Sequence, residues 1–170
     1  MAIDDCQHIF KELSKDRLPK LMDEMKRMLE SPHSMSEFNA VGVGKAKALK
    51  KLKLNSDFQG CYVLSDDSGP LYVGISRGVI QRLIQHVKGK THFDASFAYK
   101  IASEEANHGV SRGDAMLQED FKKLFNEAKE YIASMKVAFI DVSNDLELYL
   151  FEVYCSMELD TSRWNTFRTH

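Results

Sequence analysis

The chain of 170 residues has the length of one domain, and its 44% hydrophobic and 28% charged residues are ordinary for a globular protein. Its ten Phe, six Tyr and one Trp exclude a chain that is disordered throughout. Its apolar stretches fall short of the roughly eighteen residues of a membrane span. The acidic start MAIDDCQHIFKEL is not typical of a signal peptide. We therefore expect a cytoplasmic protein that does not enter membranes.

The net charge of -2 hides an uneven distribution of charge along the chain. Residues 1–40 carry six basic and eight acidic side chains, residues 41–100 carry ten and four, and residues 101–170 carry seven and thirteen. The middle third therefore has a net charge of +6 and can present a basic face to a polyanion, whatever the global pI.

The N-terminal segment, residues 3–31, predicts one or two helices because apolar side chains recur at every third or fourth position. Pro19 interrupts the pattern and predicts a break in the helix just before it. A short helix is expected after Ser34 or Ser36, with the serine as its N-cap.

Residues 40–55, AVGVGKAKALKKLKLN, contain five lysines and no acidic residue. On its own this pattern predicts a helix with one solvent-exposed basic face. Gly42 and Gly44 form a GxG, but no third glycine or preceding strand accompanies them, which excludes a dinucleotide-binding loop. The lysines of the segment are Lys45, Lys47, Lys50, Lys51 and Lys53.

A β-hairpin with a long loop is predicted by two apolar runs, CYVL at 61–64 and LYVGI at 71–75, which flank the turn-forming sequence SDDSGP. Residues 76–88 predict a helix with one apolar stripe. Arg82 and His86 lie four residues apart on it, so they share a face one turn from each other.

The remaining elements complete an α+β fold. Residues 92–107 predict a strand or loop that passes into a helix, and residues 113–133 predict an amphipathic helix. The run MKVAFIDV at 135–142 predicts a third strand, and a last helix follows with Ser143 or Asn144 as its cap. We expect a small central three-stranded antiparallel sheet flanked by helices.

Two glycine and tyrosine clusters lie on the predicted hairpin, and three polar residues follow them on later elements. In chain order these are Gly60-Cys61-Tyr62, Tyr72-Val73-Gly74, Arg82, Glu152 and Asn165. Over about residues 58–167 this ordered set resembles the GIY-YIG nuclease superfamily. Cys61 and Val73 stand where the family has Ile, both at apolar strand positions.

The resemblance implies metal-dependent hydrolysis of phosphodiester bonds, with Glu152 as ligand of Mg²⁺ or Mn²⁺. A metal there would stabilise the leaving oxygen, and one carboxylate with waters suits Mg²⁺. Arg82 can hold a phosphate bidentately. Glu147 is the alternative ligand if the register of the last helix differs. The catalytic residues implied are Tyr62, Tyr72, Arg82, His86, Glu152 and Asn165.

The general base stays open between two residues. A tyrosine ordinarily has a pKa of about 10 and is a poor base unless a cation lowers that pKa. The resemblance implies that Tyr62 activates the water and that Tyr72 orients Tyr62 or the phosphate. His86 either takes the proton or hydrogen-bonds the base.

Other metal sites are not expected. His92 and His108 lack a known ligand spacing and predict surface or core roles. Cys6, Cys61 and Cys155 are odd in number and include no CxxC pair, which predicts free thiols rather than disulfides or a zinc site.

We therefore expect a helical extension at 1–57 and a nuclease domain at 58–170 that cleaves DNA by one-step attack of water. The alternative is a non-cleaving DNA-binding module with the same fold. Lys45–Lys53 and Gly74 are expected to contact the nucleic acid. The N-terminal helices are expected to bind DNA, cover the sheet, or mediate contact with a second copy or a partner protein.

Overall fold

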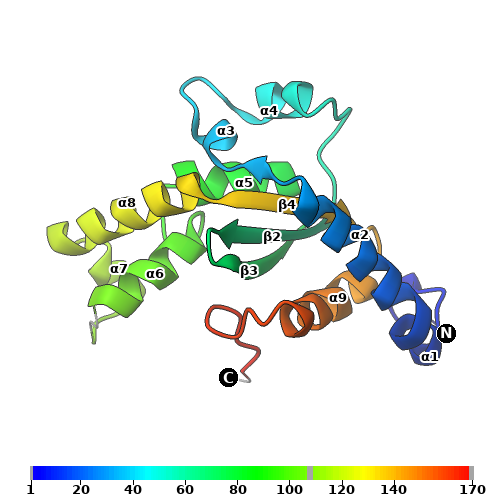
Figure 1. Ribbon diagram of the computed structural model, residues 1–170. Coiled ribbons are helices and arrows are strands. Elements are labelled where there is room, and N and C mark those ends of the chain that lie inside the picture. Colours follow the sequence, from blue (N-terminus) through cyan, green and yellow to red (C-terminus); the bar gives the residue numbers. More distant parts are fainter. Residues whose placement is uncertain (1, 107–108, 169–170) are drawn as a thin grey trace. The chain divides into compact units, whose positions relative to one another are not determined.

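The computed structural model describes residues 2–106 and 109–168 and confirms the α+β class (Figure 1). Its elements in chain order are η1 (Ile3–Asp5), α1 (Phe10–Glu12), η2 (Leu13–Arg17), α2 (Leu18–Glu30), β1 (His33–Ser34), α3 (Ser36–Asn39), α4 (Lys45–Lys51), β2 (Gly60–Asp66), β3 (Gly69–Ser76), α5 (Val79–Lys88), α6 (Ser96–Ala106), α7 (Arg112–Ala115), α8 (Glu119–Ser134), β4 (Lys136–Asp141) and α9 (Asp145–Glu158).

The chain divides into two compact units, each described by itself. The first unit comprises the described residues of Met1–His33, Ser56–Val79 and Lys136–His170. The second unit comprises the described residues of Ser34–Asn55 and Ile80–Met135. The helical segment expected at 1–57 thus contributes to both units.

The sheet has four strands in the order β1-β4-β2-β3, where three were expected. β2 pairs antiparallel with β3 on one side and with β4 on the other. The additional strand, β1, has only two residues, so it is too short to show an alternating apolar pattern in the sequence.

The hairpin turn is tighter than the long loop that the sequence predicts. Asp66 and Gly69 are paired across the two strands, so only two residues connect them. The Asp66 carboxylate accepts hydrogen bonds from the backbone N–H of Ser68 at 2.8 Å and from its hydroxyl at 2.6 Å. Gly69 has a φ of 120°, which a side chain would disfavour. The turn-forming residues therefore extend both strands instead of forming a loop.

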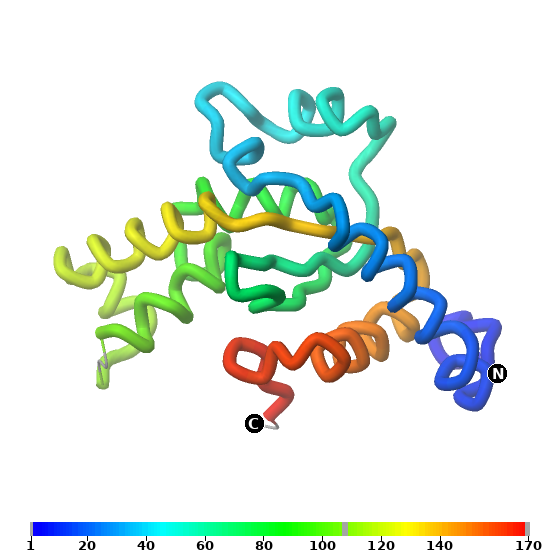
Figure 2. Tube along the Cα trace, in the orientation of Figure 1, coloured from blue at the N-terminus to red at the C-terminus, as the bar shows by residue number. Residues whose placement is uncertain are grey.

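The core of the first unit lies between one face of the sheet and helices α2 and α9. Apolar side chains of the N-terminal helix, the hairpin and the C-terminal helix meet there. Figure 2 traces these three segments, which are far apart in the sequence. The fully or nearly fully buried members include Leu21, Met22, Met25, Cys61, Val63, Val73, Phe151 and Cys155. Removing this apolar surface from water is the main stabilising contribution in the unit.

The N-terminal helical segment continues through the position where a break was expected. A π-helical turn, η2, leads directly into α2, and Pro19 lies in the first turn of α2. Proline lacks the N–H and its ring crowds the preceding turn of a regular helix, and the wider π turn before Pro19 leaves room for the ring. The predicted break is therefore replaced by a wider helical turn.

The second unit is helical. α6 and α8 pack against each other. α6 lies within residues 92–107, for which the sequence predicts a strand or loop that passes into a helix. The Lys88 ammonium donates to the carbonyl oxygens of Ala40 at 2.8 Å and of Val43 at 2.6 Å, which holds the loop before α4. Ser36 begins α3 rather than capping it.

Within the described ranges, none of the helices is both long enough and apolar enough to span a bilayer.

Candidate active site

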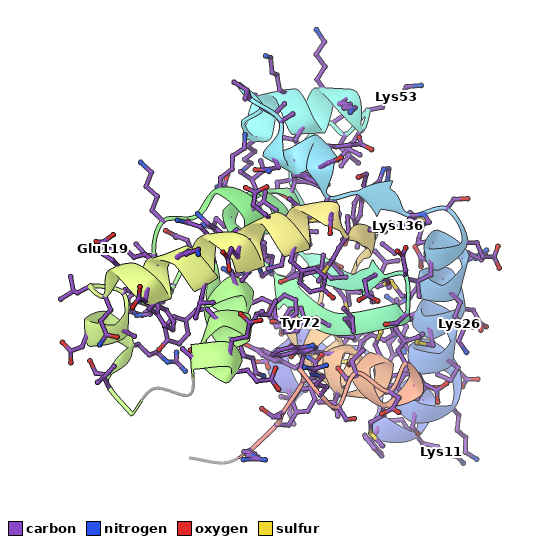
Figure 3. All side chains as sticks on the ribbon, turned by 60° about the vertical axis from the view of Figure 1, so that its left-hand side comes forward. Lys11, Lys26, Lys53, Tyr72, Glu119 and Lys136 are labelled. Carbon is purple, nitrogen blue, oxygen red and sulfur yellow. The ribbon has the colours of Figure 1, made fainter. Side chains whose placement is uncertain are left out.

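The hairpin brings the two tyrosines and Gly74 together on one face of the sheet. Tyr62 lies opposite Gly74 in the register, and Tyr72 lies opposite Leu64. The two tyrosine rings have centroids 6.3 Å apart and are tilted by 53°. Tyr62 is only 1% exposed, whereas Tyr72 is half-buried. Figure 3 labels Tyr72.

Gly74 is required by the position of the Tyr62 side chain. A Cβ atom at residue 74 would overlap the hydroxyl and the ring carbons of Tyr62. The glycine thus permits a direct approach of the tyrosine to the strand backbone. This contact gives Gly74 a packing role, and its expected contact with nucleic acid stays a prediction.

Asn165 joins the C-terminal segment to β3 through a pair of hydrogen bonds. Its Oδ1 accepts from the backbone N–H of Val73 at 2.9 Å, and its Nδ2 donates to the carbonyl of Val73 at 2.7 Å. Val73 lies between Tyr72 and Gly74, so the amide fixes the strand backbone between these two residues. The structure thus shows a positioning contact for Asn165.

Asn165→Ala is expected to lower the free energy of unfolding by about 1–3 kcal/mol, because two backbone groups of Val73 lose their partner. Urea denaturation followed by circular dichroism measures the change. Ser162→Ala, an exposed substitution in the same segment, serves as control and should shift the value by less than about 0.5 kcal/mol. Equal stability of both variants would contradict the prediction.

Glu152 is a half-buried carboxylate without a compensating cation. It follows Phe151, a core residue of α9, and burial raises the pKa of its carboxyl group. Across the part of the chain that the structure describes, it makes no ion pair or hydrogen bond. An ionised carboxylate in such a place is stabilised by binding a cation.

Glu147, the alternative ligand on the same helix, has a different environment. The Nε of Arg17 donates to its Oε2 at 2.7 Å, and the imidazole of His8 lies 3.7 Å from its Oε1. Its backbone N–H donates to the side chain of Asn144, which caps α9 as expected. The Glu147 charge is therefore already matched, so Glu152 is the better candidate for a metal ligand. No sequence pattern points to Arg17, which lies 130 residues from Glu147.

The carboxylate of Glu152 lies close enough to β2 for its charge to act on Cys61. Burial raises the pKa of the Cys61 thiol well above its ordinary value, with further contributions from the Cys155 thiol and from Glu152. Both cysteines are free and buried, as expected.

Glu152 lies on the helix that covers one face of the sheet, and the two tyrosines lie on the opposite face. Successive side chains of a strand point to opposite faces. Cys61 and Val73 point to the face covered by α9, so Tyr62 and Tyr72 point to the other. A phosphate that contacts both Glu152 and Tyr72 would have to reach around the edge of the sheet at β3, where Asn165 binds.

Arg82 belongs to the second unit and is bound by neutral groups. Its guanidinium donates to the carbonyl oxygens of Phe93 at 3.3 Å and Asp94 at 2.9 Å, and to the Ser96 hydroxyl at 2.6 Å. These bonds hold the turn before α6. Its expected role at a phosphate stays a prediction.

His86 is fully buried in the second unit, with its ring edge-to-face with Phe97 at 6.4 Å. Burial, with a smaller contribution from the Arg82 charge, lowers the pKa of His86 from 6.5 to about 3. The imidazole is therefore neutral at pH 7 and is a weak proton acceptor. His86 is therefore poorly suited to take a proton from water at neutral pH.

The five lysines of residues 45–53 are all exposed, as predicted. Four lie on α4, and Lys53 follows the end of that helix (Figure 3). Lys51 forms an ion pair with Glu37 at 2.9 Å. The segment thus presents cationic side chains that a polyanion can reach.

A closed metal site is absent from residues 2–106 and 109–168, because no group of three or more His, Cys, Asp or Glu side chains could hold an ion. His92 packs against the ring of Phe93, and His108 lies outside the described residues. A single carboxylate with waters still fits Mg²⁺, which keeps much of its hydration shell.

The sequence matches no known family model, no curated protein and no solved structure.

Proposed function

We propose that the protein is a divalent-metal-dependent DNA endonuclease of the GIY-YIG type. The observation that carries the proposal is the half-buried Glu152 carboxylate, which makes no ion pair with the residues that the structure describes and whose charge acts on Cys61, the neighbour of Tyr62 on β2. Bound there, Mg²⁺ or Mn²⁺ would supply Lewis-acid stabilisation of the leaving oxygen.

Because Tyr62 and Tyr72 differ in exposure, they are assigned different roles. Tyr72 is half-exposed and can contact a phosphate or the attacking water directly. Tyr62 is buried, so activation of water by Tyr62 requires its hydroxyl to become accessible when DNA binds. The nicking rates of Tyr62→Phe and Tyr72→Phe separate these roles. The variant that lacks the general base should lose the larger part of its rate, because only the base removes a proton from water.

The other residues act on the substrate or on the strand. Arg82 is proposed to neutralise charge on the phosphate, which requires exchange of its present carbonyl partners for phosphate oxygens. Asn165 holds Val73 and thereby orients Tyr72. The lysines of α4 supply affinity for the DNA backbone that does not depend on sequence.

Glu152→Gln is expected to reduce plasmid nicking by at least about a hundredfold, because the variant cannot bind the metal through a charged ligand. The assay compares Mg²⁺, Mn²⁺ and EDTA. The matched control is Glu158→Gln on the same helix, whose exposed carboxylate pairs with Lys26 at 3.7 Å and should not affect the rate. Undiminished nicking by Glu152→Gln, or none by the wild type, would contradict the proposal.

A non-cleaving DNA-binding module is the second candidate, favoured by the exposed lysines of α4. It predicts binding to duplex DNA that weakens steeply with salt and is independent of metal. Binding without nicking in the same assay identifies it.

A further inference from the structure

The second unit contains an open cavity of about 460 Å³ that no role described above uses. It lies between the segment after α5, helix α7 and helix α8. We call it the lysine cavity, and its lining includes Lys90, Phe93, Lys122, Phe125, Asn126 and Lys129. Its volume is within the usual range of about 300–1,000 Å³ for small-ligand sites.

The charge of the lysine cavity favours an anion. Among the described residues that line it, three are lysines and none is acidic. The Lys122 ammonium pairs with Glu119 at 2.7 Å, on the exposed part of α8. The charge of Lys90 acts on Lys129 as a like charge, and a bound anion would relieve this repulsion.

The environment of Lys129 supports this interpretation. Its ammonium lies 5.1 Å from the centroid of the Phe125 ring and donates to the carbonyl of Gly89 at 3.2 Å. Burial lowers the pKa of Lys129, the Glu130 carboxylate opposes this change, and the Lys90 charge adds to it. The ammonium is thus held at the cavity wall by neutral groups.

An exposed aromatic ring lies beside these cations. Phe93 is 75% exposed, and the centroid of its ring is 4.0 Å from that of His92. The Thr91 hydroxyl donates to the Asp94 carboxylate at 2.9 Å and accepts from the Asp94 N–H at 3.2 Å, which closes the turn that carries the ring. Exposed aromatic rings next to lysines bind the bases of single-stranded nucleic acids by stacking.

We propose that the lysine cavity binds one nucleotide of a single DNA strand, with its phosphate at Lys90 and Lys129 and its base on Phe93. A free nucleotide has the same chemistry. That the bound nucleotide belongs to a DNA strand rests on the proposed nuclease function. That the cavity binds a phosphate and a base is independent of that function.

The test is fluorescence anisotropy of a labelled oligothymidine of about six nucleotides, in EDTA so that no cleavage occurs. The double substitution Lys90→Gln and Lys129→Gln is expected to weaken binding by at least about tenfold. Phe93→Ala is expected to weaken it by about fivefold or more. Lys123→Gln is the matched control, since Lys123 lies on α8 outside the cavity and pairs with Glu127; it should change binding by less than about twofold.

Competition distinguishes the sources. Unlabelled oligothymidine is expected to compete better than thymidine monophosphate, and inorganic phosphate least. Equal competition by the mononucleotide would overturn the choice of a strand, and equal competition by phosphate would overturn the role of Phe93. Unchanged binding by the cavity variants, or no binding by the wild type, would overturn the site itself. If Lys129→Gln does not fold, Lys90→Gln and Phe93→Ala decide, because both side chains are exposed.

The outcome is separate from that of the nuclease test. Loss of binding in the cavity variants of a protein that does not nick DNA supports the cavity and refutes the nuclease. Nicking by a protein whose cavity variants bind the oligonucleotide normally supports the nuclease and refutes the cavity site.

Discussion

Gly74→Ala is expected to lower the free energy of unfolding by about 1–3 kcal/mol, although it adds only one methyl group. The added carbon would overlap the hydroxyl and ring of Tyr62, which lies opposite residue 74 in the register and is 1% exposed. A buried ring cannot move aside without displacing its neighbours. Urea denaturation followed by circular dichroism measures the loss.

Two comparisons identify the cause of that loss. Gly109→Ala is the matched control, since nothing lies within 4 Å of a Cβ at that exposed position and its φ is not in the left-handed region. In a Tyr62→Leu background, Gly74→Ala should cost less than it does in the wild type, because the shorter side chain leaves room for the methyl group. An equal cost in both backgrounds would show that the strand backbone, not the tyrosine, requires glycine.

Acid is expected to destabilise the protein through His86. The folded protein lowers the pKa of His86 to about 3, whereas the unfolded chain has the ordinary value near 6.5. Below pH 6.5 the unfolded chain therefore binds a proton that the folded protein does not. Stability is lost as the pH falls from about 6.5 to 3, by up to about 1.4 kcal/mol per pH unit and on the order of 4 kcal/mol in all.

Urea denaturation across this pH range, for the wild type and His86→Gln, measures the contribution. The raised pKa of Glu152 acts in the opposite direction, since the folded state binds that proton more readily, and it cancels in the difference between the two proteins. The variant should show a flatter dependence on pH. His33→Gln, which removes a partly exposed imidazole, is the control. Parallel curves for wild type and His86→Gln would contradict the prediction.

Local sequence patterns were sufficient to predict the hairpin and the last helix. The runs at 61–64 and 71–75 have the residue types of buried strands, and they lie within β2 and β3. Asn144 caps α9 because its side chain can accept the N–H of a residue three positions later, which is a local property. Both elements carry candidate site residues, so most of the site could be located along the chain.

The partners of those residues could not be predicted, because they are distant in the sequence. Glu147 and Glu152 are both glutamates on one helix, and only Arg17, 130 residues away, shows which of them is already paired. Asn165 meets Val73 across 92 residues. His86 shares a helix face with Arg82 in the sequence, but Phe97 on α6 covers it, and the sequence did not establish that helix.

The contact between Asn165 and Val73 has a consequence for self-association. An unpaired strand at the margin of a sheet offers its N–H and carbonyl groups to strands of other molecules, which is a common route to aggregation. The Asn165 amide occupies one such pair of groups on β3, as a neighbouring strand would. One side chain thus denies foreign strands the N–H and carbonyl of Val73, next to the half-exposed Tyr72.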